Sequence, residues 1–365
     1  MRAVRTDRVR VTLMSTPSFS SAGERRLAFV TGGSGFLGGR LIEVLTQRGW
    51  RVRALARSEA AAGRVEALGA EAARGDLLDE AALTGALAGC AVAFHAAAHF
   101  KLWGPRAEFD RVNVAGTRAL LEAARKAPGL RRVVAVGAAA VVIGQPRPVT
   151  DATESLPLLA PAFAPYSASK AEAERLVLAA NGSRDGFSTI VVRPPTIWGA
   201  GMPTLDQLAE AIAAGRWRWV AGGGQAMSTA HVDNVCHALL LAAERGRGGE
   251  AYFVSDGQDG TVKGVFSAFL ATRGLAAPDA SVPFPVAWAM AGLMGAAWRA
   301  FRLAGEPPLT RQLLQLIGHP LTLDIAKARG ELGYAPVVSW ADGLAAMRAS
   351  AAPPAVRAPA PSRAA

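Results

Sequence analysis

The stretch LAFVTGGSGFLGG, residues 27–39, joins an apolar run to a glycine-rich turn and then to a leucine-spaced segment. The apolar run at 27–31 suits a buried strand, and the segment after the turn has the periodicity of a helix. Gly32, Gly35 and Gly38 recur at every third position. Glycine permits the tight turn, and without side chains a pyrophosphate can approach the first amides of the helix. This arrangement predicts a nucleotide site, although the spacing differs from G-x-G-x-x-G.

Strand and helix candidates alternate along the chain after this turn. The strand candidates lie at 27–31, 51–56, 71–74, 91–95, 131–137 and 187–193, and a last one is expected at 251–254. Such alternation is typical of a Rossmann-type, doubly wound parallel sheet with helices on both faces. The α/β fold is expected to carry a smaller, mostly helical C-terminal substrate domain.

The expected domain organisation combines this alternation with the composition of the two ends. We expect a disordered basic extension at 1–26, a Rossmann domain at 27–195 plus 228–257, a substrate-binding domain at 196–227 plus 258–347, and a disordered Ala/Pro tail at 348–365. The two ends carry +4 and +3 of the net charge of +11, which leaves +4 for the body. No basic face with aromatic platforms is evident, so nucleic acid is not an expected partner.

The second informative stretch is YSASK, residues 166–170, in a segment predicted to be helical. Tyr166 and Lys170 stand four residues apart and therefore share one helical face. A free tyrosine titrates near pH ~10, and an adjacent ammonium lowers the pKa of the phenol because it favours the phenolate. Such a pair can give a proton to a carbonyl oxygen or take one from an alcohol. The spacing alone is common on helices, and the preceding nucleotide motif gives it meaning.

In this order the two motifs resemble the extended short-chain dehydrogenase/reductase (NAD-dependent epimerase/dehydratase) superfamily, roughly from Arg26 to Met347. Further matching stretches are GDL at 75–77, HAAA at 95–98, NVAGT at 113–117, RPPTIWG at 193–199, HVDNV at 231–235, AYFV at 251–254 and LGYAP at 332–336. FKLWG at 100–104 and GEPPLTR at 305–311 look most like the 3β-hydroxysteroid dehydrogenase-like branch. That branch also includes bacterial reductases of 2-alkyl-3-oxoalkanoic acids.

The resemblance implies roles for particular residues. Tyr166 would exchange the proton, Lys170 would bind the nicotinamide ribose and lower the tyrosine's pKa, and Asn113 would support the lysine through a water-linked arrangement. His95 is expected to pack beside the cofactor. The expected cofactor-binding positions are Gly32, Gly35, Phe36, Leu37, Gly38, Arg57, Asp76, Leu77, Ala96, Ala97, Ala98, Tyr166, Lys170 and Pro194.

The choice of cofactor depends on the segment after the second strand. It offers no carboxylate where NAD enzymes hold the ribose diol, and Arg57 stands there instead. An arginine suits bidentate contact with a 2′-phosphate, although Arg57 can also be read as an ordinary solvated side chain. We therefore expect NADP, with NAD as the alternative.

One feature departs from the reductases of the resembled family, which place a serine or threonine at the end of the fifth strand. In VGAAAVVIG, residues 136–144, that position falls on Gly137, Ala138 or Ala139, and none of these carries a hydroxyl. Losing one donor to a developing oxyanion costs on the order of 10²–10³ in turnover. Three explanations stay open: another donor such as Thr196 or a backbone N–H, slower or different chemistry needing Tyr166 alone, or nucleotide binding without useful catalysis.

An uncharged segment runs from Val282 to Trp298 and is followed by Arg299. Its seventeen residues fall short of the ~20 that a comfortable membrane span needs. It is expected to cap the substrate pocket or pack in the second domain, or alternatively to contact a membrane surface through 286–298. A homodimer is a further open expectation. The TDATE stretch at 150–154 is expected to form a turn.

The remaining composition narrows the class of protein. Cys90 and Cys236 have neither metal-ligand spacing nor a disulfide framework, and the histidines are scattered, so no metal site is expected. The N-terminal segment lacks the apolar run of a secretory signal, and a cytoplasmic location is expected. The sequence predicts an NADP-preferring oxidoreductase acting on a hydrophobic keto or hydroxy compound that is steroid-, terpenoid- or 3-oxoacyl-like. The alternatives are a nucleotide-sugar epimerase or dehydratase and a non-catalytic NADP-sensing regulator.

Overall fold

The computed structural model describes residues 26–144, 148–159 and 163–351. The expected basic extension lies outside the described residues apart from Arg26. The tail was expected to be disordered from residue 348, but residues 348–350 belong to a helix that ends at Ser350.

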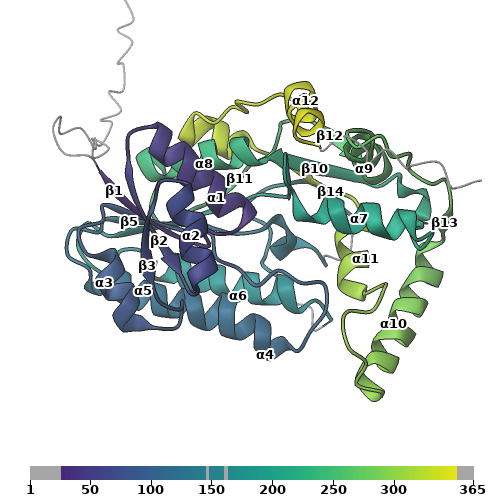
Figure 1. The fold of residues 1–365 in the computed structure, drawn as a ribbon, viewed down its shortest axis with the longest axis horizontal. Helices are drawn as coiled ribbons and strands as arrows, with labels where there is room; N and C mark the ends of the chain where they lie inside the picture. Colours follow the sequence, from purple (N-terminus) through teal and green to yellow (C-terminus); the bar gives the residue numbers. More distant parts are fainter. Residues whose placement is uncertain (1–25, 145–147, 160–162, 352–365) are drawn as a thin grey trace, which may run out of the picture.

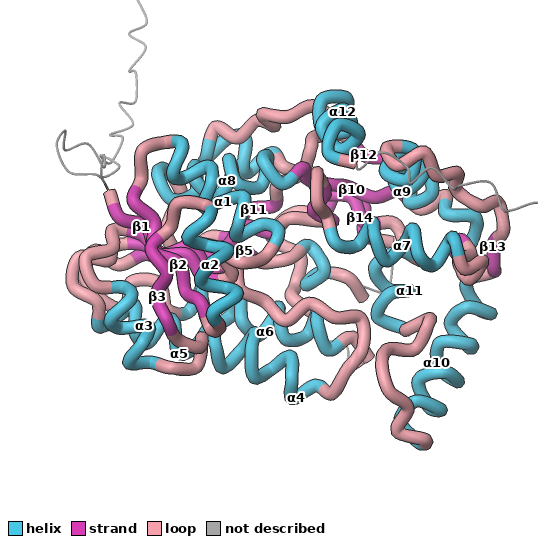
Figure 2. Tube along the Cα trace, in the orientation of Figure 1, coloured by secondary structure: helices cyan, strands magenta, loops and turns pink. Residues whose placement is uncertain are grey.

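Seven parallel strands form the central sheet, in the order β11-β7-β5-β4-β1-β2-β3 (Figure 2). The strands are β1 (Leu27–Thr31), β2 (Arg51–Ala56), β3 (Glu71–Arg74), β4 (Val92–His95), β5 (Arg132–Val136), β7 (Ser188–Arg193) and β11 (Ala251–Phe253). The first three begin and end where the sequence predicts. β2 and β3 are added on one side of β1, and β4 and the later strands on the other, so the strand order reverses between β1 and β4. Open α/β sheets bind ligands at the carboxyl ends of the strands beside such a switch point.

Helices cover both faces of this sheet (Figure 1). One face is packed by α1 (Phe36–Gln47), α2 (Glu59–Ala67) and α8 (Val232–Arg245). The other is packed by α3 (Glu80–Leu87), α5 (Gly116–Lys126) and α6 (Pro165–Ala179). Each helix buries an apolar stripe against the nearly continuous apolar strands, as a doubly wound sheet requires. The Rossmann-type fold expected from the sequence is confirmed.

A second sheet, which the sequence did not predict, has five strands and the order β12-β10-β14-β6, with β8 paired to β10. Its strands are β6 (Val149–Ala152), β8 (Thr196–Trp198), β10 (Ala226–His231), β12 (Asp259–Thr261) and β14 (Leu321–Leu323). The expectation of a turn over 150–154 is therefore wrong for residues 150–152, which belong to β6 and pair with β14. Glu154 follows, and its carboxylate accepts the Phe253 N–H at 2.7 Å.

Helices dominate the rest of the C-terminal half, joined by a short pair of strands, β9 (Trp219–Val220) and β13 (Ser281–Val282). They are α7 (Pro203–Ala213), α9 (Val262–Ala271), α10 (Phe284–Ala300), α11 (Arg311–Ile317) and α12 (Trp340–Ser350). Trp198, Trp219 and Phe269 are fully buried in the core of this part. α10 forms its outer edge, at the lower right of Figure 1, and α11 lies on its inner side. Within the described residues, no helix is long and apolar enough to cross a membrane.

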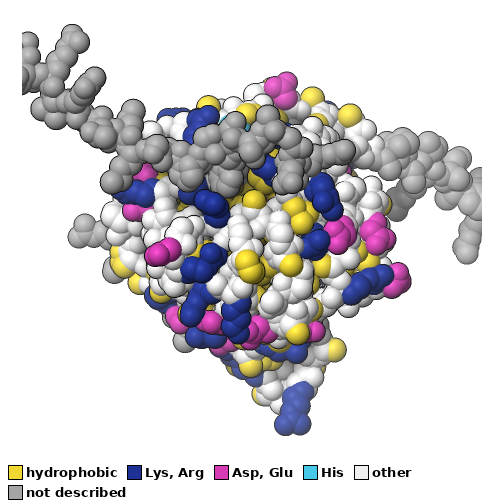
Figure 3. All heavy atoms as spheres, turned by 90° about the vertical axis from the view of Figure 1, so that its left-hand side faces the viewer, with side chains coloured by type: hydrophobic (Ala, Val, Ile, Leu, Met, Phe, Trp, Pro, Cys, Tyr) yellow, Lys and Arg dark blue, Asp and Glu magenta, His cyan; other side chains and the backbone are white. Residues whose placement is uncertain are grey.

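Charged side chains on the surface are mixed in sign. In the view of Figure 3, lysines and arginines lie among aspartates and glutamates. Several cations are paired, as in Arg53 with Glu71 at 3.0 Å and Arg74 with Glu59 at 2.7 Å. Exposed pairs of this kind contribute little to stability, and they neutralise charge locally.

Candidate active site

The glycine-rich turn between β1 and α1 brings three backbone segments into contact. Gly32 has a φ of +74°, and a Cβ there would lie 2.6 Å from the Ala97 nitrogen. A Cβ on Gly38 would meet the Gly32 carbonyl oxygen. α1 starts after Gly35, which has no side chain to cap the helix, so its first amides can bind an anion. The turn therefore suits the pyrophosphate of a dinucleotide.

A buried chain of hydrogen bonds supports the floor of this site. The Ala97 N–H donates to Thr31 Oγ1 at 3.2 Å, and Thr31 Oγ1 lies 2.7 Å from His95 Nδ1. His95 Nε2 lies 2.9 Å from Thr117 Oγ1, whose hydroxyl donates to the Asn113 carbonyl at 2.6 Å. Because that hydroxyl proton is already used, His95 must donate from Nε2, which fixes its neutral tautomer. Burial, with the charge of Lys170, lowers the pKa of His95 to about 3, so His95 has a structural role.

Asn113 lies in a π-helical segment, Asp110–Ala115, and is buried. Its Oδ1 accepts the His99 N–H at 2.7 Å, and its Nδ2 donates to Ser169 Oγ at 2.9 Å. Ser169 Oγ in turn donates to the Tyr166 carbonyl at 2.8 Å. The structure therefore links Asn113 to the first turn of α6 through Ser169, and this is the contact by which it supports the Tyr166–Lys170 helix.

Tyr166 and Lys170 occupy one face of α6, as predicted. Tyr166 is half-buried, and Lys170 is buried with its ammonium donating to the Val136 carbonyl at 2.6 Å. Burial raises the pKa of Tyr166 to about 12, opposite to the predicted lowering. Burial also lowers the pKa of Lys170 to about 8, against the charge of Glu174, which raises it. In this structure the removal of the phenol from water outweighs the lysine, whose charge is directed at a backbone carbonyl.

The three positions at which the hydroxyl was expected differ in their surroundings. A Cβ on Gly137 would lie 2.6 Å from Val191 Cγ1, so no side chain fits there. Ala139 faces the opposite way, into a core with Phe253. Of the three expected positions, Ala138 is the one that belongs to the cluster against which Tyr166 packs, together with Ala140 and Ile143.

Apolar and aromatic side chains surround Tyr166. The Phe100 ring meets the Tyr166 ring edge-on at 4.9 Å, although 55% of Phe100 is exposed. Phe163 meets Trp288 of α10 edge-on at 5.2 Å. Leu316 and Leu321 complete the cluster around Ala138 and Tyr166. Thr196, the alternative donor, lies in β8 and pairs with Thr229 of the second sheet. Phe100 and the cluster of Ala138, Ala140 and Ile143 thus give Tyr166 apolar neighbours.

The remaining predicted cofactor positions lie along the carboxyl edge of the central sheet. Arg57 is exposed between β2 and α2. Asp76 is exposed and accepts the Leu78 N–H at 3.0 Å, while Leu77 is buried. Phe36 and Leu37 open α1, the alanines 96–98 follow β4, and the Pro194 carbonyl accepts the Ala139 N–H at 2.9 Å.

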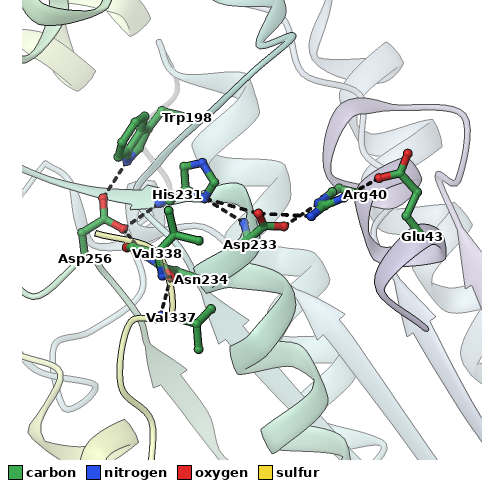
Figure 4. Close-up of polar contacts among 9 residues, drawn as sticks. All are labelled: Arg40, Glu43, Trp198, His231, Asp233, Asn234, Asp256, Val337 and Val338. Atoms are coloured by element: carbon green, nitrogen blue, oxygen red, sulfur yellow. Dashed lines mark hydrogen bonds and ion pairs between the residues drawn. The ribbon is translucent and has the colours of Figure 1, made fainter. Parts of the chain in front are cut away.

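A network that sequence reasoning missed fastens the two sheets together (Figure 4). Asp256 accepts hydrogen bonds from Trp198 Nε1 at 2.6 Å, from the His231 N–H at 2.7 Å and from Asn234 Nδ2 at 2.7 Å. Asp233, at the start of α8, pairs with Arg40 of α1 at 2.5 Å. The HVDNV stretch thus anchors the glycine-turn helix to the second sheet, a role that its family resemblance alone did not reveal.

A doubly wound sheet, a glycine turn at its first strand and a Tyr-x-x-x-Lys helix, together with relatives that are ketoreductases and dehydrogenases, identify an NAD(P)-dependent oxidoreductase of the extended short-chain dehydrogenase/reductase class. Within that class, the chain belongs to the 3-beta hydroxysteroid dehydrogenase/isomerase family, whose model matches residues 29–279. The branch suggested by the sequence is thereby confirmed.

Comparison with individual proteins agrees with this assignment. The chain is 47% identical to a 4-hydroxy-2-methyl-3-oxo-4-farnesyl-3,4-dihydroquinoline-1-oxide ketoreductase of Stigmatella aurantiaca, over 88% of this chain and 95% of the relative. It is 36% identical to a 2-alkyl-3-oxoalkanoate reductase of Stenotrophomonas maltophilia (strain K279a), over 88% of this chain and 98% of the relative. A solved dTDP-glucose 4,6-dehydratase of Bacillus anthracis, in complex with NAD, shares the fold with a TM-score of 0.67 at 19% identity, covering 89% and 96% of the two chains.

Proposed function

We propose that this protein reduces a ketone, or oxidises the matching secondary alcohol, on a hydrophobic substrate, with Tyr166 as the proton donor or acceptor. The observation that carries the proposal is the position of Tyr166, which shares a helical face with Lys170 and is surrounded by Phe100, Ala138 and other apolar side chains. A nucleotide sugar would require cations for its phosphates. The relatives that act on ketones and oxoalkanoates support the same substrate class.

The chain's own residues suffice for the proton transfer. When bound, the nicotinamide cofactor supplies or accepts the hydride. In reduction, the carbonyl carbon gains that hydride, the carbon–oxygen π bond breaks, and the Tyr166 phenol gives its proton to the oxygen. Burial raises the pKa of Tyr166 to about 12, so the phenol holds this proton at neutral pH. Lys170 is assigned to the nicotinamide ribose, and the glycine turn to the pyrophosphate.

The direct test is a panel of hydrophobic ketones assayed by oxidation of NADPH, with UDP-sugars offered in parallel. Reduction of a prenylated, polycyclic or 3-oxoacyl ketone is the expected result. Conversion of a UDP-sugar without net cofactor turnover would replace the proposal with an epimerase or dehydratase. Tight NADPH binding with no carbonyl reduced would replace it with a nucleotide-sensing role.

Replacement of Arg57 by alanine is expected to raise the Kd for NADPH at least about tenfold, because a charge-assisted contact to a 2′-phosphate contributes ~1.5–3 kcal/mol. The Kd for NADH should stay nearly constant. The exposure of the guanidinium between β2 and α2 leaves it free to reach the phosphate. Fluorescence titration of both cofactors measures the effect, and Arg64, exposed on α2, provides the control as Arg64→Ala. Tighter binding of NADH than NADPH by the wild type would remove Arg57 from cofactor selection.

We also propose that α10 contacts an anionic lipid surface. It buries Ala287, Ala291 and Gly295, whereas Leu293 is 72% exposed and Phe301, the residue after the helix, is 75% exposed. Arg299 and Arg302 are exposed at its C-terminal end, so apolar and cationic groups meet there. That combination suits the interface of a bilayer containing acidic lipids, where a hydrophobic substrate would also dissolve.

Replacement of Leu293 by glutamate is expected to weaken binding to phosphatidylglycerol-containing vesicles about tenfold or more, since burying one leucine contributes ~1.5–3 kcal/mol. Vesicle co-sedimentation measures the effect. Val337→Glu is the control, because Val337 is also apolar and exposed, at 57%, but lies outside α10. Failure of the wild type to bind any vesicle would leave α10 as a helix that caps the pocket. The homodimer stays a prediction, which light scattering on the full chain addresses.

A further inference from the structure

Helix α11 carries two glutamines, Gln312 and Gln315, on a short and otherwise largely apolar segment, RQLLQLI. They are only 1% and 4% exposed. A buried amide costs free energy unless its polar atoms find partners, so the partners indicate what each side chain does. Gln315 Nε2 donates to the Ile143 carbonyl at 3.1 Å, and its Oε1 has no hydrogen-bond partner among the described residues.

Gln312, in contrast, uses both ends of its amide, and both lead to the active site. Its Oε1 accepts the Tyr166 N–H at 2.8 Å, and its Nε2 donates to the Lys101 carbonyl at 2.7 Å. One side chain of the C-terminal part thus joins the helix that carries the phenol to the segment that follows β4. The contact spans 146 positions of sequence to Tyr166.

The Tyr166 N–H needs such a partner because α6 has no local cap. The first amides of a helix have no carbonyl within the helix to accept them. The N-cap residue of α6 is Ala164, whose methyl group cannot accept a hydrogen bond, and Pro165 follows it. Serine, threonine, aspartate or asparagine would ordinarily serve at that position. Gln312 supplies the missing acceptor from a distant element.

The Lys101 contact acts on the same phenol from the other side. Lys101 follows Phe100, whose ring lies edge-on against the Tyr166 ring at 4.9 Å. By holding the Lys101 carbonyl, Gln312 fixes the backbone next to that ring. The backbone of Tyr166 and the aromatic ring beside its side chain are therefore both held by one amide group.

We propose that Gln312 is a positioning residue that fixes Tyr166 for proton transfer, coupling α11 to the catalytic helix. This inference rests on the proposed function, in which Tyr166 exchanges the proton. Gln312 touches neither substrate nor the transferred proton, and acts only through the placement of Tyr166 and Phe100. A displacement of about 1 Å from a productive geometry can cost on the order of 10²-fold in rate.

Replacement of Gln312 by methionine keeps the volume and removes both hydrogen bonds. It is expected to lower kcat about 10- to 100-fold while the Kd for NADPH stays unchanged, since the hydrogen bonds of Gln312 go to Tyr166 and Lys101 and not to the glycine turn. Gln312→Glu keeps the shape, and its protonated carboxyl can make both bonds, so its activity should recover as the pH is lowered. If Gln312 were merely structural, its replacement would lower the Tm, and the activity of Gln312→Glu would not recover at low pH.

A second measurement does not depend on turnover. The chain has three tyrosines, so labelling with ¹⁵N-tyrosine gives three backbone amide signals, and that of Tyr166 is assigned by its loss in Tyr166→Phe. Amide hydrogen exchange at Tyr166 should be about tenfold faster in Gln312→Met than in the wild type. Gln315→Met, a matched change on the same helix, should leave this exchange rate unaltered.

The outcomes separate the two proposals. Unchanged exchange at Tyr166 in Gln312→Met, or an equal loss of kcat in Gln315→Met, would overturn the positioning role. Faster exchange at Tyr166 in a protein that reduces no ketone would support the Gln312 contact while overturning the proposed function. Faster exchange together with a lowered kcat and a constant NADPH Kd would support both.

Discussion

Replacement of Tyr166 by phenylalanine is expected to lower kcat for a hydrophobic ketone by about 10²–10⁴-fold, the range that a positioned general acid contributes. Phenylalanine keeps the ring, and with it the edge-on contact to Phe100 and the packing on Ala138. The backbone N–H to Gln312 is also kept. The hydroxyl is lost together with any contact that it makes to the cofactor, so kcat should fall far more than the affinity for NADPH, which fluorescence titration measures.

The pH profile gives this prediction a second readout. Because burial raises the pKa of Tyr166 to about 12, the acid form predominates at neutral pH and reduction should not require its deprotonation. Alcohol oxidation needs the phenolate, and its rate should therefore rise with pH. Both behaviours should disappear from the residual activity of Tyr166→Phe.

The other two tyrosines provide controls. Tyr252 donates its hydroxyl to Glu331 at 2.8 Å, and Tyr334 donates to the Ser255 carbonyl at 2.9 Å. Tyr252→Phe and Tyr334→Phe should lower stability by ~1 kcal/mol, the net contribution of a typical hydrogen bond, and leave kcat near the wild-type value. A Tyr166→Phe enzyme that keeps its kcat would exclude this phenol as the proton donor.

The sequence predicts the central sheet well because its short strand candidates alternate regularly with helical segments and turns. β1, β2 and β3 match their predicted bounds. The second sheet is different, since Leu321–Leu323 pairs with Val149–Ala152, a segment far away in the sequence. Strands of three or four residues are too short for a periodic signal, and such long-range pairing is decided by packing.

The site divides in the same way. Tyr166 and Lys170 follow from a local motif, so their shared helical face is predictable. The direction of the pKa shift of Tyr166 cannot be predicted from that motif. It depends on how deeply the phenol is buried and on the Lys170 ammonium, which donates to the Val136 carbonyl. Gln312 carries no local signal either, since a glutamine in a short helix is ordinarily a surface residue. Likewise, the sequence does not show which methyl group, that of Ala138 or that of Ala139, lies on the side of Tyr166.

Installing a hydroxyl at Ala138 is expected to raise kcat for ketone reduction by about 10²–10³-fold, the reverse of removing one donor to a developing oxyanion. Ala138 belongs to the cluster against which Tyr166 packs, so a serine there would bring an Oγ into that cluster. Steady-state kcat and the NADPH Kd, measured for Ala138→Ser beside the wild type, give the effect. The fold should be retained, because serine adds one atom at a position that is 7% exposed.

The two neighbouring positions make the test specific. Ala139 lies in an apolar core, so Ala139→Ser buries a hydroxyl there and should cost ~1–3 kcal/mol of stability with no gain in kcat. A side chain on Gly137 would overlap Val191, so Gly137→Ser should destabilise more strongly. A gain at Ala138 alone would mean that the proton-transfer machinery around Tyr166 is intact and limited by the missing donor. If the wild type turns over, an unchanged kcat in a stable Ala138→Ser variant that binds NADPH would mean that another group already donates to the oxyanion. With no wild-type turnover, the same result would point to nucleotide binding without catalysis.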